Sequence, residues 1–323
     1  MKPAYLRRGF IGSAACGLAA LSLFIGWKSR SVALELTDPP FYRPQPLARV
    51  QATYSDLARG DAADPGGTWR SEDVEGLQLW TLKRKASARG MVLLLHGFGD
   101  DRWGTSPALR WFPTLDASIF TYLRRDDALR AGGPAPFVTF GARESEDVVR
   151  IVHHLETTGT PRSRVVLMGR SLGASVGLLA LARLEAEGRG PLAGIIWEGA
   201  PSSSRDFGER LVRGSKDRLW HPLLAPLVGN LGSRWAAQRG RYRREETDLE
   251  RALKGRRLAT PSLCFLATQD RLAPPSKQRS IASRFERSET LEVPTWHLHC
   301  AEILGPRYAE AIQASTDTWL KTP

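Results

Sequence analysis

The sequence predicts an α/β domain built on a mostly parallel sheet with helices on both faces. Short apolar runs of strand length alternate along the chain with longer segments of helical pattern, which is the signature of such a sheet. Most of these runs are apolar throughout, which is typical of strands buried on both faces. Ligands bind such sheets at the carboxyl ends of the strands, so the residues that follow each strand are candidates for function.

The first half of the domain begins with an outer strand. The segment Leu77–Lys83 alternates apolar and polar residues, as a half-buried strand does. Two continuous apolar runs, Met91–Gly99 and Ala117–Leu123, indicate buried strands. The segment Glu144–Glu156 carries its apolar residues on one helical face, which predicts a helix that packs on the sheet.

The second half repeats the alternation. A buried strand, 164–169, is followed by a long helix over Ser171–Gly188, with Gly188 as its expected end. We expect three more strands and a final helix over 307–320. The strands are Leu192–Ala200, Ser262–Ala267 and Thr290–His299.

The segment 1–37 is predicted to be a signal or a membrane anchor rather than part of the fold. The uncharged run Gly9–Trp27 has basic residues on both sides and is long enough to span a bilayer, but it also fits the apolar part of a secretory signal. Arg7–Ile11 partly resembles a twin-arginine export signal, and Ser31–Ala33 is a candidate cleavage site. We therefore expect a protein that is membrane-anchored or exported to the cell envelope.

Residues 38–75 are predicted to form a proline-rich linker or strap, because Asp38–Val50 alone holds four prolines. The folded domain is then expected over 76–323, with a cap insertion over about 202–260. The insertion holds an apolar piece followed by a strongly basic piece. It reads as a lid with a solvated charged face, or as a lid that lies against a membrane and admits a lipid-derived acyl substrate.

Charge and cysteine content limit the partners. The net charge is +12, which indicates either a solvated basic surface or attraction to anionic lipid headgroups. No nucleic-acid-binding module accompanies the charge, so we expect no nucleic-acid partner. Three cysteines do not make a disulfide framework, and we expect no bridge between Cys264 and Cys300. No residue cluster has the spacing of a zinc site, so we expect no metal.

The segment Gly169–Gly173 carries the strongest chemical signal. It reads G-R-S-L-G and lies where a strand becomes a helix. A serine on so tight a turn is held in a strained backbone, and side chains at the flanking positions would collide with neighbouring chain, which explains the glycines. The turn would lift Ser171 above the sheet, where a substrate and a base can reach it.

Two further segments supply partners for this serine. Glycines in His96–Gly99 let the backbone approach it, so the amides of Phe98 and Leu172 are candidates for an oxyanion hole. His96 itself is expected to be a structural hydrogen-bonding residue.

A serine nucleophile also needs a base and an acid that orients the base. Asp270 follows a strand, and His299 ends the last one. His297 is the alternative base, since residues two apart in an extended segment point the same way. Glu198, at the end of an earlier strand, is the alternative acid.

With these residues in place, the chain resembles the α/β-hydrolase superfamily over roughly 77–320. The segments that carry the likeness are LLLHGFGDDR, TFGARESEDV, GRSLGAS, TQDRLAP and LHCAE. The nearest likeness is to bacterial hydrolases described as serine-aminopeptidase-like, often with an N-terminal membrane segment. Asp126 lies where these relatives carry an acid, but the surrounding arginines and prolines depart from their pattern.

The resemblance implies a serine hydrolase without a cofactor, which cleaves a carboxylic ester through an acyl-enzyme on Ser171, with His299 as base and Asp270 orienting it. The same site could serve an amide or peptide. A non-catalytic binding module of the cell envelope with a hydrolase fold is the third alternative. The expected partner is a small-molecule or lipid-derived acyl substrate.

Overall fold

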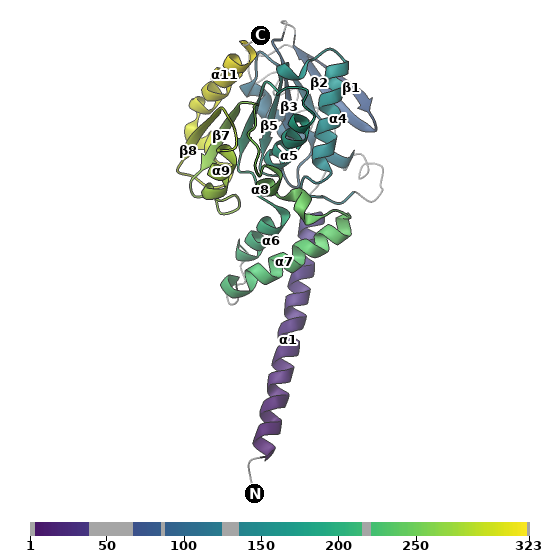
Figure 1. Ribbon diagram of the computed structural model, residues 1–323, viewed down its shortest axis with the longest axis vertical. Coiled ribbons are helices and arrows are strands. Elements are labelled where there is room, and N and C mark those ends of the chain that lie inside the picture. Colours follow the sequence, from purple (N-terminus) through teal and green to yellow (C-terminus); the bar gives the residue numbers. More distant parts are fainter. Residues whose placement is uncertain (1–3, 39–66, 85–87, 125–135, 215–220, 322–323) are drawn as a thin grey trace.

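The computed structural model describes residues 4–38, 67–84, 88–124, 136–214 and 221–321. Within these ranges eight strands form one sheet, in the order β1-β2-β4-β3-β5-β6-β7-β8 (Figure 1). The first two strands, β1 and β2, pair antiparallel and β2 pairs antiparallel with β4, while all later pairings are parallel. The bounds are β1 Gly67–Val74, β2 Leu77–Arg84, β3 Met91–Leu95, β4 Asp116–Ile119, β5 Val165–Arg170, β6 Gly194–Glu198, β7 Ser262–Ala267 and β8 Ser288–Val293. The predicted α/β class with a mostly parallel sheet is confirmed.

Each central strand serves two apolar layers, which is why its residues are apolar without interruption. In β3, Leu93 and Leu95 join the layer that contains helices α4 (Glu144–Thr157) and α5 (Leu172–Ala186). Leu94 points the other way, into the layer that contains the 3-10 helix η1 (Arg102–Trp111) and helix α11 (Pro306–Lys321). Alternation along a strand sends successive side chains to opposite faces, so both faces require apolar residues.

The predicted cap insertion forms helices at one end of the sheet. It contains α6 (Ser204–Gly214), α7 (His221–Gly240), η4 (Arg244–Thr247) and α8 (Leu249–Ala252). Figure 1 shows α6 and α7 beside the upper end of helix α1 (Ala4–Thr37), which extends away from the sheet. The shorter helices α9 (Pro275–Ala282) and α10 (Cys300–Leu304) and the 3-10 helices η2 (Tyr122–Arg124) and η3 (Arg162–Arg164) complete the described elements.

The last turns of α1 belong to the apolar core. Val32 and Leu36 are buried in the same layer as α5, and Leu36 is fully buried. Gly232 in α7 allows the close approach, since a Cβ there would lie 2.6 Å from Val32 Cγ1. The segment that the sequence marks as an address therefore ends as a packed helix of the cap, and the candidate cleavage site Ser31–Ala33 lies inside it.

No helix in the described part of the chain is long and apolar enough to cross a membrane. The expected membrane anchor in 1–37 is therefore not supported, and a location at the cell envelope stays a prediction. Of the expected linker, 39–66 lies outside the described residues. Its last part is not a linker but strand β1, which pairs along its whole length with β2. The folded domain thus begins before residue 76.

The final strand is shorter than the sequence predicts. We expected it to run to His299, but β8 ends at Val293. The next residue, Pro294, has no N–H to donate to a neighbouring strand, so the ladder stops there. Residues 296–299 then form a turn in which the His299 amide donates to the Trp296 carbonyl at 3.3 Å. This difference decides which histidine reaches the site.

Candidate active site

Ser171 occupies the tight turn between β5 and α5. Its backbone has φ 53 and ψ −124, a conformation that residues with a side chain rarely adopt. The flanking glycines are required by contact: a Cβ on Gly169 would lie 2.3 Å from the Gly173 carbonyl oxygen, and one on Gly173 would lie 2.2 Å from the Leu95 carbonyl oxygen. The steric reason that the sequence suggested for both glycines is confirmed.

A histidine bridges this serine to a carboxylate. The Nε2 atom of His297 lies 3.0 Å from the Ser171 hydroxyl oxygen, and its Nδ1 atom lies 2.6 Å from Asp270 Oδ2. Ser171 and Asp270 are both buried, and the His297 side chain is only 17% exposed. The structure therefore brings together two of the expected residues, Ser171 and Asp270, in a continuous line of hydrogen bonds through His297.

His299, which the sequence favoured as the base, does not reach the serine. Its ring contacts Glu302 at 2.7 Å and its side chain is half exposed. The argument from parity assumed an extended segment, but Leu298 has φ 63, in the left-handed region. The turn at Leu298 sends the two rings in different directions, so the alternative His297 occupies the position expected for His299.

Asp270 is fixed by the loop that follows β7. Its Oδ1 atom accepts hydrogen bonds from the amides of Leu272 and Ala273, both at 2.8 Å, which leaves Oδ2 for His297. An aspartate that accepts from amides two and three residues ahead is a common turn arrangement. Because both oxygens have partners, the carboxylate is held in one orientation toward the imidazole.

Glu198, the alternative acid, has other partners. Its carboxylate contacts the Arg170 guanidinium, the Cys300 amide and the Tyr308 hydroxyl. The carboxylate that contacts His297 is that of Asp270. Cys300 and Cys264 are both buried free thiols, and burial raises the pKa of each well above its usual value.

No known family model matches the sequence, and no curated protein matches it. The structure is nevertheless similar to solved esterases. The Pyrococcus furiosus esterase Pf2001 has a TM-score of 0.58 at 14% identity, over 79% of this chain and 93% of that one. An esterase of the bacterial hormone-sensitive lipase family has a TM-score of 0.56 at 17% identity, over 93% and 97%. A bacterial heroin esterase has a TM-score of 0.57 at 17% identity, over 86% and 93%.

The chain has the α/β-hydrolase fold. At these identities the likeness concerns architecture, and it agrees with the order of the strands and with the serine turn after β5.

In this α/β-hydrolase fold the turn after β3 lies beside the serine. A Cβ built on Gly97 would lie 3.9 Å from Ser171 Cβ, so the chain approaches closely there, as the sequence predicted. His96 is buried, and its Nε2 accepts from the Tyr122 amide at 3.3 Å, so its Nδ1 donates to the Gly97 carbonyl at 3.0 Å. With both ring nitrogens engaged, His96 is a structural residue, as expected.

The candidate oxyanion residues Phe98 and Leu172 follow these two turns. Leu172 is the first residue of α5. The Phe98 ring packs against Phe140 and Phe207, with ring centres 5.4 and 5.6 Å away. Because Phe207 lies on α6, the cap contacts the domain directly above the turn after β3.

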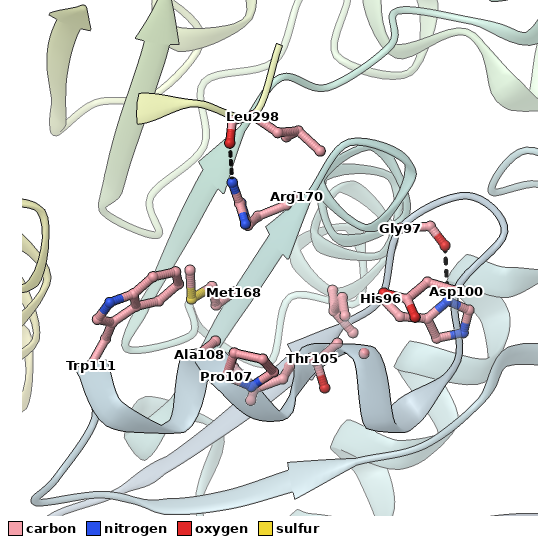
Figure 2. A pocket seen from close by; sticks show the side chains of 13 residues that line it. His96, Gly97, Asp100, Thr105, Pro107, Ala108, Trp111, Met168, Arg170 and Leu298 are labelled. Carbon is pink, nitrogen blue, oxygen red and sulfur yellow. Dashed lines mark hydrogen bonds between the residues drawn. The ribbon is translucent and has the colours of Figure 1, made fainter. Parts of the chain in front are cut away.

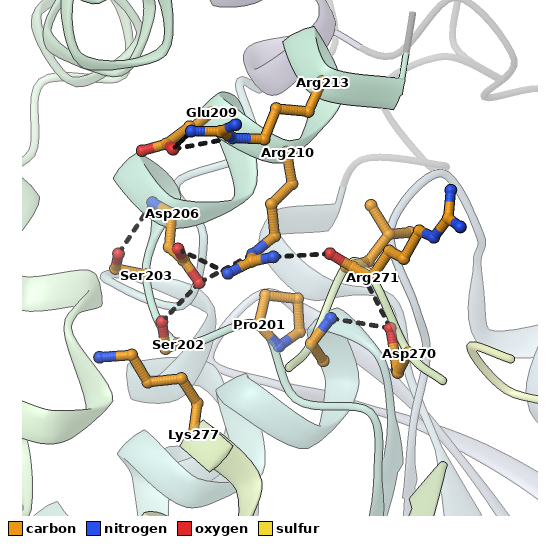
Figure 3. A network of polar contacts seen from close by, with 12 residues as sticks. Pro201, Ser202, Ser203, Asp206, Glu209, Arg210, Arg213, Asp270, Arg271 and Lys277 are labelled. Atoms are coloured by element: carbon orange, nitrogen blue, oxygen red, sulfur yellow. Dashed lines mark hydrogen bonds and ion pairs between the residues drawn. The ribbon is translucent and has the colours of Figure 1, made fainter. Parts of the chain in front are cut away.

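The cap also contacts the loop that carries Asp270. Arg210 on α6 donates to the Arg271 carbonyl at 2.8 Å, and its guanidinium pairs with Asp206 one turn earlier (Figure 3). Asp206 in turn accepts from the Ser202 hydroxyl at 2.9 Å. The contact ties the position of helix α6 to the chain on either side of Asp270.

A pocket of about 190 Å³ lies between the ends of β3 and β5 and the helix η1 (Figure 2). Arg170, His96, Gly97 and Leu298 line it, together with apolar residues that include Met168 and Trp111. Ser171 is not among its lining residues. Burial is the main cause that raises the pKa of Asp100, another lining residue, to about 6, partly opposed by the hydrogen bond from the Asp101 amide.

Other expectations concern residues that carry less structure. Asp126 lies outside the described residues. Within the described part of the chain, no group of three or more His, Cys, Asp or Glu side chains could hold a metal ion.

Proposed function

We propose that the protein is a serine hydrolase that cleaves a carboxylic ester through an acyl-enzyme on Ser171. One observation carries the proposal, namely the line of contacts from the Ser171 hydroxyl through both ring nitrogens of His297 to Asp270. A serine hydroxyl is a weak nucleophile until a base accepts its proton, and this arrangement places a base at 3.0 Å. The likeness to structures described as esterases supports an ester as substrate.

In the first half of the reaction the Ser171 oxygen attacks the substrate carbonyl carbon while His297 Nε2 takes the hydroxyl proton. Asp270 holds the proton on Nδ1, which leaves Nε2 free to act as base, and it stabilises the imidazolium that forms. The amides of Phe98 and Leu172 would stabilise the negative oxygen of the tetrahedral intermediate. His297 then returns the proton to the leaving alcohol, and the ester bond breaks to give the acyl-enzyme.

In the second half a water molecule attacks the acyl carbon, and His297 takes one of its protons. The tetrahedral intermediate collapses, the bond to Ser171 breaks, and the serine oxygen recovers its proton from His297. The acid product leaves, and the enzyme returns to its starting state. Every group that moves a proton belongs to the chain, so the sequence of steps needs no cofactor.

The decisive experiment combines a fluorophosphonate label with ester hydrolysis. We expect the wild type to be labelled, and Ser171→Ala and His297→Ala to lose labelling and about 10⁴-fold or more in kcat. His299→Ala is the matched control: it changes the same residue type two positions away in a half-exposed ring, and we expect kcat within about 3-fold of the wild type by analogy with neutral surface changes.

A panel of esters of increasing acyl length, measured beside aminoacyl amides, then separates the substrate classes. Faster turnover of esters supports the proposal, whereas a preference for amides supports a peptide or amide hydrolase on the same residues. A folded wild type that takes no label and turns over neither class contradicts an enzyme and favours a binding module. Loss of activity in His299→Ala with retention in His297→Ala would contradict the assigned base.

A further inference from the structure

The last residues of two neighbouring strands form an ion pair beside the serine turn. Arg170 ends β5 and Glu198 ends β6, and the two are paired in the register of the sheet. The guanidinium Nε lies 2.9 Å from Glu198 Oε2, and the carboxylate side chain is 1% exposed. Burying a carboxylate costs several kcal/mol unless charge and hydrogen bonds compensate it, so the pair must be well satisfied to persist.

Glu198 satisfies this condition by reaching the chain that follows His297. Its Oε1 atom accepts from the Cys300 amide at 3.0 Å, and its Oε2 atom also accepts from the Tyr308 hydroxyl at 3.1 Å. The backbone carbonyl of the same glutamate accepts from the Ser171 amide at 2.9 Å. One residue thus binds the serine turn through its backbone and the chain beyond His297 through its side chain.

Arg170 reaches the same turn from a second direction. Its Nη2 donates to the Leu298 carbonyl, a contact that Figure 2 shows as a dashed line above the pocket. Leu298 has φ 63 and immediately follows His297, so this contact fixes the residue whose unusual backbone sends the ring toward Ser171. Arg170 precedes the serine by one residue, so the turn is attached directly to the chain that carries the nucleophile.

We propose that Arg170 and Glu198 are positioning residues that hold the turn of His297 against the serine turn. The inference rests on the proposed function, because it concerns the geometry of that reaction. Neither side chain contacts the Ser171 hydroxyl or the His297 ring; each acts through the backbone at Leu298 or Cys300. The pair therefore governs the separation of base and nucleophile rather than the chemistry itself.

A purely structural ion pair would have a different effect from this one. Loss of packing alone lowers the fraction of folded enzyme, whereas a displaced base lowers kcat in the molecules that remain folded. A displacement of about 1 Å at a reacting group can cost about 100-fold in rate. Binding of the substrate does not depend on the base, so KM should change much less than kcat.

The first test replaces Arg170 by methionine, which keeps the length of the side chain and removes the guanidinium. We expect Arg170→Met to lower kcat by about 10- to 100-fold with KM within about 3-fold. Arg170→Lys, which has one ammonium in place of a planar fork, should recover only part of the loss.

The matched control is Arg183→Met. Arg183 also joins a carboxylate, Glu146, to a backbone carbonyl, that of Ala142, and both arginine side chains are partly exposed, at 39% and 33%. It lies on α5 far along the helix from Ser171, and we expect its loss to leave kcat unchanged.

A charge left unpaired at Glu198 could prevent folding of the single variant. The double variant Arg170→Met/Glu198→Gln removes that charge, and its amide oxygen can still accept from the Cys300 amide. We expect it to fold and still to lose at least 10-fold in kcat, because the contact to Leu298 is gone. A kcat within 2-fold of the wild type in this folded double variant would overturn the proposal.

Amide hydrogen exchange gives a readout that needs no activity. In Arg170→Met or the double variant, the amides of residues 297–300 should exchange at least 10-fold faster, while Arg183→Met should leave them unchanged. Unchanged exchange in the first two variants would overturn the positioning role, whether or not the protein is an enzyme. A wild type without ester hydrolysis would contradict the proposed function alone, since exchange still decides the contact.

Discussion

The imidazole of His297 lies directly against the backbone of Gly199. A Cβ built on Gly199 would lie 2.9 Å from Cε1 and 3.0 Å from Nδ1 of the ring. Gly199 has φ +64, so glycine is favoured there by its conformation as well as by contact. The wall behind the base is thus bare backbone, and any side chain at this position would push the ring toward a different place.

Gly199→Ala should therefore reduce activity more than it reduces stability. We expect kcat to fall by about 10- to 100-fold because the displaced ring loses its alignment with Ser171. Gly188→Ala is the matched control, since Gly188 has φ +68 but nothing within 4 Å of the added Cβ. Both variants carry the same backbone strain, so equal kcat values for the two would contradict a steric effect on His297.

The glycines of the serine turn predict a second pair of outcomes. Gly173→Ala would place its Cβ 2.2 Å from the Leu95 carbonyl oxygen, which is backbone and has little freedom to move. We expect it to lower the free energy of unfolding by about 1–3 kcal/mol or more, as overpacking does, and to abolish labelling of Ser171.

Gly177→Ala, one turn further along α5, serves as its comparison. There the added Cβ would meet the end of a leucine side chain, Leu95 Cδ1, at 2.9 Å. Alanine is favoured over glycine inside a helix by about 1 kcal/mol, which offsets the small shift of that methyl group. Urea unfolding of both variants should give a large loss for Gly173→Ala and a change near zero for Gly177→Ala. Similar losses would argue against the rigid contact at the serine turn.

The nucleophile turn and the acid could be predicted because their signals are local. The G-x-S-x-G segment fixes Ser171 by steric need between a strand and a helix, and Asp270 stands directly after a buried strand. Each of these arguments uses only a few consecutive residues. The alternating pattern of strands and helices is likewise a local property, and it gave the fold class.

The identity of the histidine was lost through one backbone angle. His297 and His299 are equivalent in an extended strand, and only the left-handed Leu298 separates them. Leucine is not a residue that announces such a conformation. The available signal was Pro294, which cannot continue a central ladder and marks the end of β8 before both histidines. The contacts of Glu198 and Arg170 with this turn join residues about 100 or more positions apart, which no local pattern reveals.

The buried Asp147 predicts how stability depends on pH. Burial is the main cause that raises the pKa of its carboxyl to about 6, partly opposed by the hydrogen bond from the Leu123 amide and by Arg150. The unfolded chain has a pKa near 3.9. A raised pKa in the folded state means that its contribution to stability is fully present below about pH 4 and is lost as the pH rises through 6.

Asp147→Asn removes this titration and keeps an oxygen that can accept from the Leu123 amide. Between pH 4 and pH 7 the wild type should lose up to about 3 kcal/mol relative to the variant, since each pKa unit corresponds to about 1.4 kcal/mol. Denaturant unfolding of both proteins at pH 4, 5.5 and 7 measures the difference. A gap between the two that stays constant over this range would contradict the raised pKa.

The junction of α1 with the cap gives the final prediction, because it rests on a single small residue. A Cβ on Gly232 would lie 2.6 Å from Val32 Cγ1 and 3.0 Å from the Ser29 carbonyl oxygen, so the two helices meet there without a side chain between them. On α1 itself, Gly26 has nothing within 4 Å of an added Cβ. The same change, glycine to alanine in a helix, therefore meets a stiff β-branched neighbour at one site and open space at the other.

Alanine should raise helix stability by up to about 1 kcal/mol at both positions, and only the contact differs. We expect Gly26→Ala to be neutral or stabilising, and Gly232→Ala to destabilise by about 1–3 kcal/mol because Val32 and α7 must separate. Limited proteolysis should then cut α1 near residues 26–37 faster in Gly232→Ala than in Gly26→Ala. Equal stability and equal cutting in the two variants would mean that the last turns of α1 do not pack on α7 in solution, and the burial of Leu36 would then have no role in holding the cap.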